Sequence, residues 1–178
     1  MVKLDLHTHI WEAFNFQEPS PEIAKRVVEE IKNKGIDGIA ITDHHNYEWA
    51  MRFKELVEEL YPSEVIIIPG WEIEIRPESS PFDEYQVTEL FLSETSVFRI
   101  YCHPGYYSPN IIIEDNIHAI ELDNYIHNWH IRKPLVERIA EEHSLMTVEV
   151  SDAHNIENLG LRYTEVDLDE LHSRALQL

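Results

Sequence analysis

The stretch VKLDLHTH, residues 2–9, decides the fold because it joins a buried strand to two closely spaced histidines. Its apolar and β-branched residues predict a strand. Side chains alternate along a strand, so we expect Asp5, His7 and His9 on one side and the intervening residues on the other. A carboxylate and two imidazoles on a buried face cost desolvation unless something pairs with them. A divalent metal ion is one such partner, and a pair of hydrogen-bonded histidines at a strand end is the alternative.

Composition sets the class of protein. The chain has 178 residues, 43% hydrophobic and 27% charged, which predicts one globular domain over residues 1–178. Its 14 Lys and Arg against 34 Asp and Glu leave a net charge of −20, which repels long nucleic acids and anionic membranes. The sequence contains no long apolar run and no signal-peptide pattern, and Cys102 is its one cysteine. We therefore expect a cytoplasmic protein that does not enter a membrane.

Strand-like and helix-like segments alternate along the chain. A helix is expected after Ser20, with Pro21 in its first turn and Gly35 as its C-terminal stop. This order predicts an α/β fold, with a parallel sheet or barrel and helices on the outside. Further helices are expected at 47–61 and 128–143, and further strands at 36–42, 64–75, 85–92, 97–103, 117–124, 145–151 and 161–166.

Potential metal ligands stand at the ends of five of these strands. In such folds, ligands collect at the carboxyl ends of the strands because the loops there converge. A random scatter of surface residues would not place them at one topological end. The strand-end residues are His7, His9, Asp43, His44, Glu72, His103, Asp152 and His154.

Five motifs, in order, resemble the PHP (polymerase and histidinol phosphatase) superfamily of metal-dependent phosphoesterases. DLHTH at 5–9 is similar to the family's opening D-x-H-x-H element, and GIDGIAITDHHN at 35–46 to its T-D-H element. IIIPGWEIEI at 66–75 resembles the glycine-x-glutamate strand, and HPG at 103–105 the His-Pro element. VEVSDAHN at 148–155, followed by LGLRYTEV, resembles the closing S-D-x-H element.

The resemblance implies a distorted (β/α)7 barrel with two or three divalent ions at the carboxyl ends of its strands. Imidazole and carboxylate ligands favour Zn, Mn or Fe. The implied chemistry is hydrolysis of a small phosphorylated metabolite or nucleotide by a metal-bridged hydroxide, without a separate general base. The implied ligands are His7, His9 and Asp152 for the first ion, Glu72 as a bridge, His103 for the second ion, and His44 with His154 for the third. Among these, Glu72, His44 and Asp152 are the implied catalytic residues.

Two positions depart from the family pattern. Asn15 stands where some relatives carry a histidine ligand, and Glu12 is the only carboxylate nearby. Gln86 stands where phosphatase members carry another, and Glu89 would point the opposite way unless the strand bulges. These departures keep three alternatives open: a degenerate metal-binding or interaction module, a nuclease, and an amide or lactone hydrolase.

Other polar residues have ordinary interpretations. Asp5 and Asp43 are expected to orient ligand histidines, or else to make strand-end hydrogen bonds. His45 should point away from His44. His127 and His130 are expected to be surface histidines, with substrate contact as the alternative; His118, His143 and His172 are expected to be structural or solvated. Glu121, Asp123 and Asn124 end another strand and could line the pocket.

Aromatic residues and arginines bear on the substrate. The aromatic residues near motif ends are expected to pack at the barrel rim, the alternative being a wall on which a ring stacks. They are Trp11, Trp49, Trp71, Tyr106, Tyr107 and Trp129. Arginine is the usual partner of phosphate, and the sequence does not rank Arg76, Arg99, Arg132 and Arg162 for that role.

Overall fold

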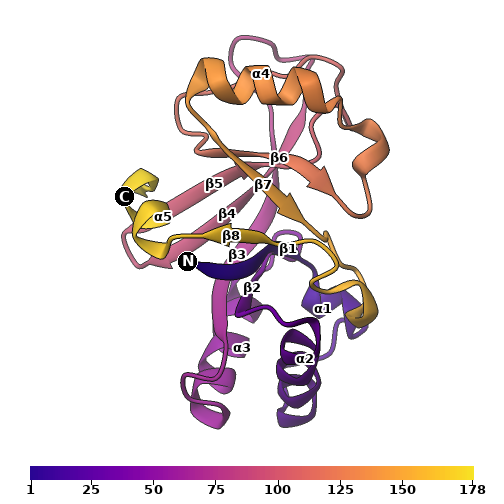
Figure 1. Ribbon diagram of the computed structural model, residues 1–178, viewed down its shortest axis with the longest axis vertical. Coiled ribbons are helices and arrows are strands. Elements are labelled where there is room, and N and C mark those ends of the chain that lie inside the picture. Colours follow the sequence, from indigo (N-terminus) through magenta and orange to yellow (C-terminus); the bar gives the residue numbers. More distant parts are fainter.

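Nine strands form one curved sheet in a computed structural model that describes all of residues 1–178. The order of pairing is β7-β6-β5-β4-β3-β2-β1-β8, and β9 pairs with β5 outside this path. Figure 1 shows α2 and α3 on one side of the sheet and α4 on the opposite side. The strands are β1 (Val2–Thr8), β2 (Gly38–Ile41), β3 (Ile66–Ile75), β4 (Tyr85–Ser93), β5 (Ser96–Tyr101), β6 (Ala119–Asn124), β7 (Met146–Val150), β8 (Thr164–Val166) and β9 (Leu176–Gln177). The helices are α1 (Ile10–Ala13), α2 (Pro21–Lys34), α3 (Tyr47–Leu60), α4 (Lys133–His143) and α5 (Leu168–Arg174), with short 3₁₀ turns η1 (Asn128–His130) and η2 (Ile156–Asn158).

The sheet closes into a distorted barrel, as expected. One cluster of 13 buried hydrophobic residues draws side chains from every strand from β1 to β8, which requires the sheet to curl around a common interior. The segment after β7 completes the closure next to β1. There the Asp152 amide donates to the His7 carbonyl at 2.9 Å, and the His9 amide donates to the Ala153 carbonyl at 2.9 Å. These bonds bring the first and last motifs of the chain together.

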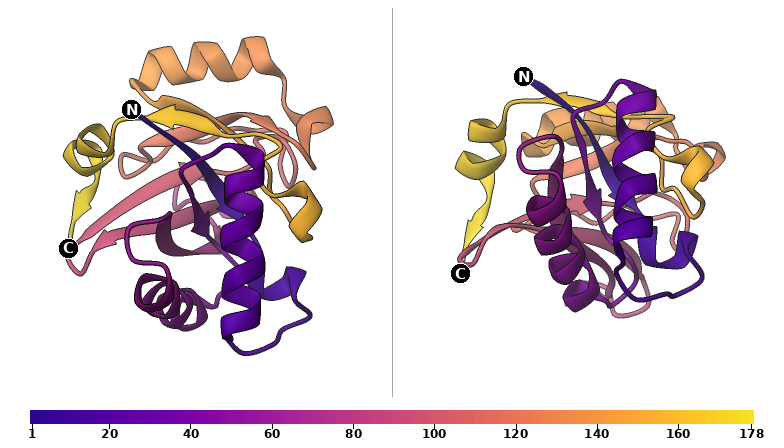
Figure 2. Two further views of the ribbon diagram at one scale, coloured as in Figure 1. Left: turned by 60° about the horizontal axis from the view of Figure 1, so that its bottom comes forward. Right: turned by 90° about the horizontal axis from the view of Figure 1, so that it is seen from below.

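The helices begin and end where local signals place them. Ser20 accepts a hydrogen bond from the Ile23 amide at 3.3 Å at the start of α2, and Gly35 ends that helix with a φ of 69°. A second core cluster lies between α2, α3 and the outer face of β2, whose Ile39 and Ile41 point toward the helices. Figure 2 shows α2 and α3 side by side over this face. None of the helices has both the length and the apolar character needed to span a bilayer.

Two expectations about the elements were wrong. A helix over 128–143 was expected, but α4 begins only at Lys133, after η1. Pro134 explains the late start, since proline fits the first turn of a helix and not its interior. The parallel pattern also breaks at β4, which runs antiparallel to β3 and to β5. Only residues 76–84 and 94–95 connect these strands, and both segments are too short for a crossover helix.

Candidate metal centre

The carboxyl ends of the strands bring all seven predicted ligands to one site. Backbone pairing sets the alignment: Thr8 pairs with Ile41 and with Ala153, and His44 forms a bridge with Glu72. The side chains form three adjacent groups that share members. Between them lies a cavity of about 170 Å³, and larger hollows elsewhere on the surface have no such lining. The cavity is lined by His44, Glu72, Gln86, His103, Tyr106, Tyr107, His127, Asp152 and His154.

The first group contains His7, His9, Glu72 and Asp152, all buried. The Nε2 atoms of His7 and His9 lie 3.1 Å apart. Glu72 Oε2 lies 3.4 Å from His7 Nε2, and Asp152 Oδ1 lies 3.2 Å from His9 Nε2. Asp152 Oδ1 has no hydrogen-bond partner although it is buried, which is costly unless a cation lies beside it. Two imidazoles and two carboxylates converging in this way are a donor set that fits a divalent transition metal.

Charge in the first group favours a cation at its centre. Burial lowers the pKa of His7, but Asp152 and Glu72 outweigh burial and raise that pKa well above its usual value. Burial raises the pKa of Glu72, but the nearby His7 and His103 outweigh burial and hold that pKa well below its usual value. The carboxylates therefore remain ionised and attract a positive charge, which a metal ion can supply as well as a proton.

The second group lies on the other side of Glu72. Glu72 Oε1 is 3.2 Å from His103 Nε2, whereas its Oε2 faces the first group. His127 Nε2 lies 3.7 Å from Asp152 Oδ2, and the rings of His127 and His103 are 4.9 Å apart between centroids. His127 Nδ1 is buried without a partner. The two oxygens of Glu72 thus face different groups, as a bridging carboxylate would require.

The sequence interpretation missed His127, which was expected on the surface. Asn124, at the end of β6, explains its position: its Oδ1 accepts the backbone amides of Ile126 at 3.0 Å and His127 at 2.9 Å. This tight turn directs His127 back over the site. Asparagine directly after a strand is a common turn signal, so the sequence held an indication that was not used.

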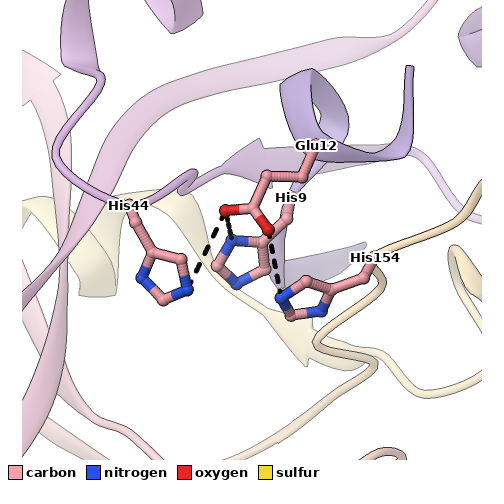
Figure 3. A group of neighbouring side chains, drawn as sticks. All are labelled: His9, Glu12, His44 and His154. Atoms are coloured by element: carbon pink, nitrogen blue, oxygen red, sulfur yellow. Dashed lines mark ion pairs between the residues drawn. The ribbon is translucent and has the colours of Figure 1, made fainter. Parts of the chain in front are cut away.

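The third group consists of His9, Glu12, His44 and His154, whose donor atoms all lie within 4.8 Å of one another. Figure 3 shows the Glu12 carboxylate directed at the three rings. Glu12 Oε1 lies 3.6 Å from His9 Nδ1 and Oε2 lies 3.6 Å from His154 Nε2, while His44 Nε2 is 3.9 Å from Oε1. The hydrogen bond with His9 lowers the pKa of Glu12 below its usual value. Glu12 therefore occupies the place for which Asn15 was considered, and Asn15 lines a different hollow.

Asp5 and Asp43 do not orient histidine rings, contrary to one of the two expectations for them. Asp5 accepts the backbone amides of Ser151 at 3.0 Å and Gly160 at 2.9 Å, so it anchors the loop that carries Asp152. Asp43 accepts the backbone amides of Trp11 and Glu12 at 3.1 and 3.0 Å. Burial raises the pKa of each carboxyl to about 6, although these hydrogen bonds oppose the shift.

A bulge in β1 separates Asp5 from the histidines. Between Asp5 and Thr8, three steps of β1 lie opposite only two steps of β2. The simple alternation expected for residues 2–9 therefore fails, and Asp5 does not share the environment of His7.

Glu121, at the middle of β6, takes the orienting role. Its Oε1 lies 2.7 Å from His7 Nδ1, and its Oε2 accepts the His103 amide at 2.6 Å and Asn124 Nδ2 at 2.9 Å. The side chain is fully buried. Glu121 thus holds a residue of the first group and a residue of the second in fixed positions, and it leaves His7 Nε2 free to face the centre.

Several other residues lie outside the three groups. Glu89 accepts from Trp71 Nε1 at 2.6 Å and from Arg99 Nε at 2.8 Å, so it faces away from the site as strand alternation predicts. Gln86 lines the cavity but is not replaced by another ligand on β4. His45 pairs with Glu74 at 2.8 Å outside the groups.

No arginine or lysine lines the cavity. Arg76 binds Glu84, and Arg99 binds Glu89. Arg162 lies 3.3 Å from Asp123, which accepts a shorter contact from Lys133. The positive charge for binding a phosphoryl group would therefore have to come from bound ions.

Comparison with known proteins identifies the family. The model of the PHP domain family matches residues 5–159. A candidate metal-dependent phosphoesterase from Bifidobacterium adolescentis shares the fold with a TM-score of 0.71 and 13% identity, over 98% of this chain and 97% of that one. PsfC from Pseudomonas syringae PB-5123 gives 0.60 and 16%, over 99% and 91% of the two chains. An amidohydrolase from Chromobacterium violaceum, solved with sulfate and no metal, gives 0.65 and 11%, over 98% and 97%.

None of the curated proteins matches the chain in sequence. The three structures share its fold at low identity, whereas the PHP family model covers most of its length. That match begins at Asp5, the first residue of the DLHTH motif, and extends past the SDAH motif that completes the site. This protein is therefore a member of the PHP domain family.

Proposed function

We propose that this protein is a metal-dependent phosphoesterase that hydrolyses a small phosphorylated molecule. The observation that carries the proposal is the convergence of nine potential ligands from separate strand ends, with Asp152 Oδ1 buried and unpaired among them. Two or three divalent ions, of Zn, Mn or Fe, suit this set of imidazoles and carboxylates. A protein of this composition, with its one cysteine buried and free, would suit the reducing cytoplasm.

The three groups assign the ligands. His7, His9 and Asp152 would hold the first ion, and Glu72 would bridge it to the second because its two oxygens face different groups. The second ion would also be held by His103 and His127. The third would lie among His44, His154 and Glu12, with His9 Nδ1 on the same side.

The chain's own residues would orient the reaction. Bound divalent ions would lower the pKa of a coordinated water and neutralise charge on the phosphoryl oxygens. Glu72, His44 and Asp152 surround the cavity and would fix where the phosphoryl group lies. Glu121 would keep the His7 proton on Nδ1, so that Nε2 stays available at the site. No further acid or base is needed, and we assign no separate general base.

A small substrate fits the surroundings of the site better than a polymer. The cavity has a volume of about 170 Å³ and no cationic lining, and the chain carries a net charge of −20. A polyanion would be repelled at long range, whereas a small phosphoester needs charge neutralisation only at the cavity itself.

Metal content and phosphoester hydrolysis together test the proposal. The protein is stripped with chelator, reloaded separately with Zn, Mn and Fe, and assayed with small phosphoesters beside Glu72→Ala. We expect at least two ions per chain and hydrolysis that Glu72→Ala lowers by more than about 100-fold, beyond the 10–100-fold typical of a supporting residue. Glu89→Gln is the matched control, because Glu89 is a buried carboxylate of the same sheet that faces away from the site.

Other outcomes distinguish the alternatives. One ion or none under all loading conditions, with no hydrolysis, would indicate a degenerate binding module. Cleavage of oligonucleotides in preference to small esters would indicate a nuclease. Turnover of amides or lactones alone would indicate a different hydrolase on the same barrel.

A further inference from the structure

Exposed aromatic side chains gather on two loops beside the cavity. We call Tyr106, Tyr107, Trp129 and His130 the aromatic rim. Tyr106 and Tyr107 follow the HPG motif after β5, and Trp129 and His130 belong to η1 after β6. Trp129 is 80% exposed and Tyr106 42% exposed. The two loops touch at Gly105, where a Cβ would lie only 3.0 Å from the His130 carbonyl oxygen.

The rim is continuous with the candidate metal centre. The Tyr106 ring lies 5.2 Å from the His103 ring and 4.6 Å from the His127 ring, between centroids. On its other side it lies 4.8 Å from His130, which in turn lies 3.4 Å from Trp129. Tyr106 and Tyr107 also line the cavity itself. Aromatic surface thus extends without a break from two potential ligands out to solvent.

Packing within the barrel explains other aromatic residues but not this rim. Trp49 is 1% exposed, stacks on Phe53 at 4.9 Å and donates Nε1 to the Gln17 carbonyl. Trp71 donates Nε1 to Glu89. Trp129, by contrast, leaves most of a large apolar side chain in water, which is unfavourable by about 25 cal/mol for each Å² of apolar surface. Exposed aromatic surface of this kind, beside a cavity, marks a binding site more often than a packing fault.

The charges around the site indicate what the rim would bind. No lysine or arginine lines the cavity, and the arginines with acidic partners nearby are held by them. An anionic group beyond the phosphoryl group would therefore lack a partner. An uncharged flat ring could instead stack on the rim, a contact worth about 1–3 kcal/mol per base in proteins that stack nucleobases.

We infer that the aromatic rim binds the leaving-group side of the substrate, and that this substrate is a phosphoester of an alcohol that carries a flat, uncharged ring. The inference rests on the proposed phosphoesterase function. Aryl groups and nucleosides share this chemistry. In the reaction, the bond between phosphorus and the ester oxygen breaks, and a water oxygen forms the new bond to phosphorus. A proton from that water passes to the leaving alcohol oxygen, so no oxidant or further reactant is required.

Steady-state kinetics on the metal-loaded protein test the inference with three esters: phenyl phosphate, adenosine 5′-monophosphate and glycerol 3-phosphate. We expect kcat/KM for at least one ring-bearing ester to exceed that for glycerol 3-phosphate by about tenfold or more. Trp129→Ala should raise KM for the ring-bearing ester about five- to tenfold with little change in kcat, because stacking is the same in ground and transition states. Trp129→Phe should restore most of the loss, and glycerol 3-phosphate should be unaffected by either variant.

Phe82→Ala is the control, since Phe82 is 99% exposed and outside the rim. Equal kcat/KM for all three esters, or an equal loss for all three in Trp129→Ala, would overturn the inference. The better of phenyl phosphate and adenosine 5′-monophosphate would tell whether the ring is aryl or a nucleobase.

Calorimetric binding keeps the inference separate from the proposed function. If no ester is hydrolysed, the phosphoesterase proposal fails, and binding of adenosine 5′-monophosphate and phenyl phosphate to the same protein is measured. Binding that Trp129→Ala weakens would support the rim as a ring site without hydrolysis. No binding of either compound would refute the rim as well.

Discussion

Replacing Glu121 with glutamine tests how the barrel prepares its histidines for a metal. The carboxylate meets three donors: His7 Nδ1, the His103 amide and Asn124 Nδ2. A glutamine has one oxygen and one NH₂ group in their place. If its oxygen keeps the His103 and Asn124 donors, the NH₂ group faces His7 Nδ1. His7 can then accept that hydrogen bond only by carrying its proton on Nε2, the atom that faces Asp152 and Glu72.

The size of the effect follows from these contacts. The wrong tautomer of His7 must lose its Nε2 proton before a metal can bind, so we expect metal affinity to fall about 10–100-fold, as for other supporting residues. Without metal, losing one hydrogen bond to a buried carboxylate should lower the free energy of unfolding by about 1–3 kcal/mol. The reverse orientation of the amide would lose two donors in place of one, and it should be less populated.

Two measurements separate metal affinity from stability. Zinc affinity is measured by competition with a chromophoric chelator, and stability by urea unfolding of the metal-free protein. Glu89→Gln is the matched control: Glu89 is also buried and accepts from Trp71 and Arg99, so that variant should lose stability but keep its metal affinity. Zinc affinity in Glu121→Gln within twofold of the unchanged protein would refute the tautomer argument.

Three further predictions concern other parts of the chain. Gly105→Ala should lower the free energy of unfolding by about 1–3 kcal/mol in urea titrations, because Gly105 has a φ of 96° and a Cβ there would meet the His130 carbonyl at 3.0 Å; an unchanged midpoint would contradict this. Burial, with help from Arg99, lowers the pKa of His118, whose Nδ1 accepts the Arg99 amide at 2.9 Å. The folded state therefore binds fewer protons than the unfolded state below about pH 6.5, and stability is lost as pH falls. His118→Asn should show a smaller loss between about pH 7 and 5 in chelator, and parallel pH curves would exclude His118 as the cause. Glu12→Gln should remove one bound ion per chain, by elemental analysis, while the remaining ions stay; unchanged metal content would exclude Glu12 as a ligand.

Local signals in the sequence were sufficient for much of the fold. Ser20, Pro21 and Gly35 define both ends of α2 because capping depends on residues within one turn of each other. The strand-end positions of His7, Glu72 and His103 were also predictable, since buried runs that turn polar mark the carboxyl ends of strands. The antiparallel course of β4 was less visible, although the short connections on either side of it permit no other arrangement.

The supporting residues of the site could not be ranked from the sequence. Glu121 and Asp5 are both acidic residues on buried strands, yet only Glu121 reaches a ligand histidine. The bulge in β1 decides between them, and it arises from how β1 pairs with β2, about thirty residues away along the chain. His127 likewise reaches the site only because a turn at Asn124 directs it there.

The sequence by itself determined which kinds of side chain end the strands, and hence the family and the chemistry that they suggest. Tertiary structure alone decided which of those side chains meet. Glu12 joins the third group and Asn15 does not, although both belong to the short segment after β1. The physical reason is that identity and periodicity are properties of neighbouring residues, whereas distances between donor atoms depend on the register, bulges and closure of a sheet formed from distant segments.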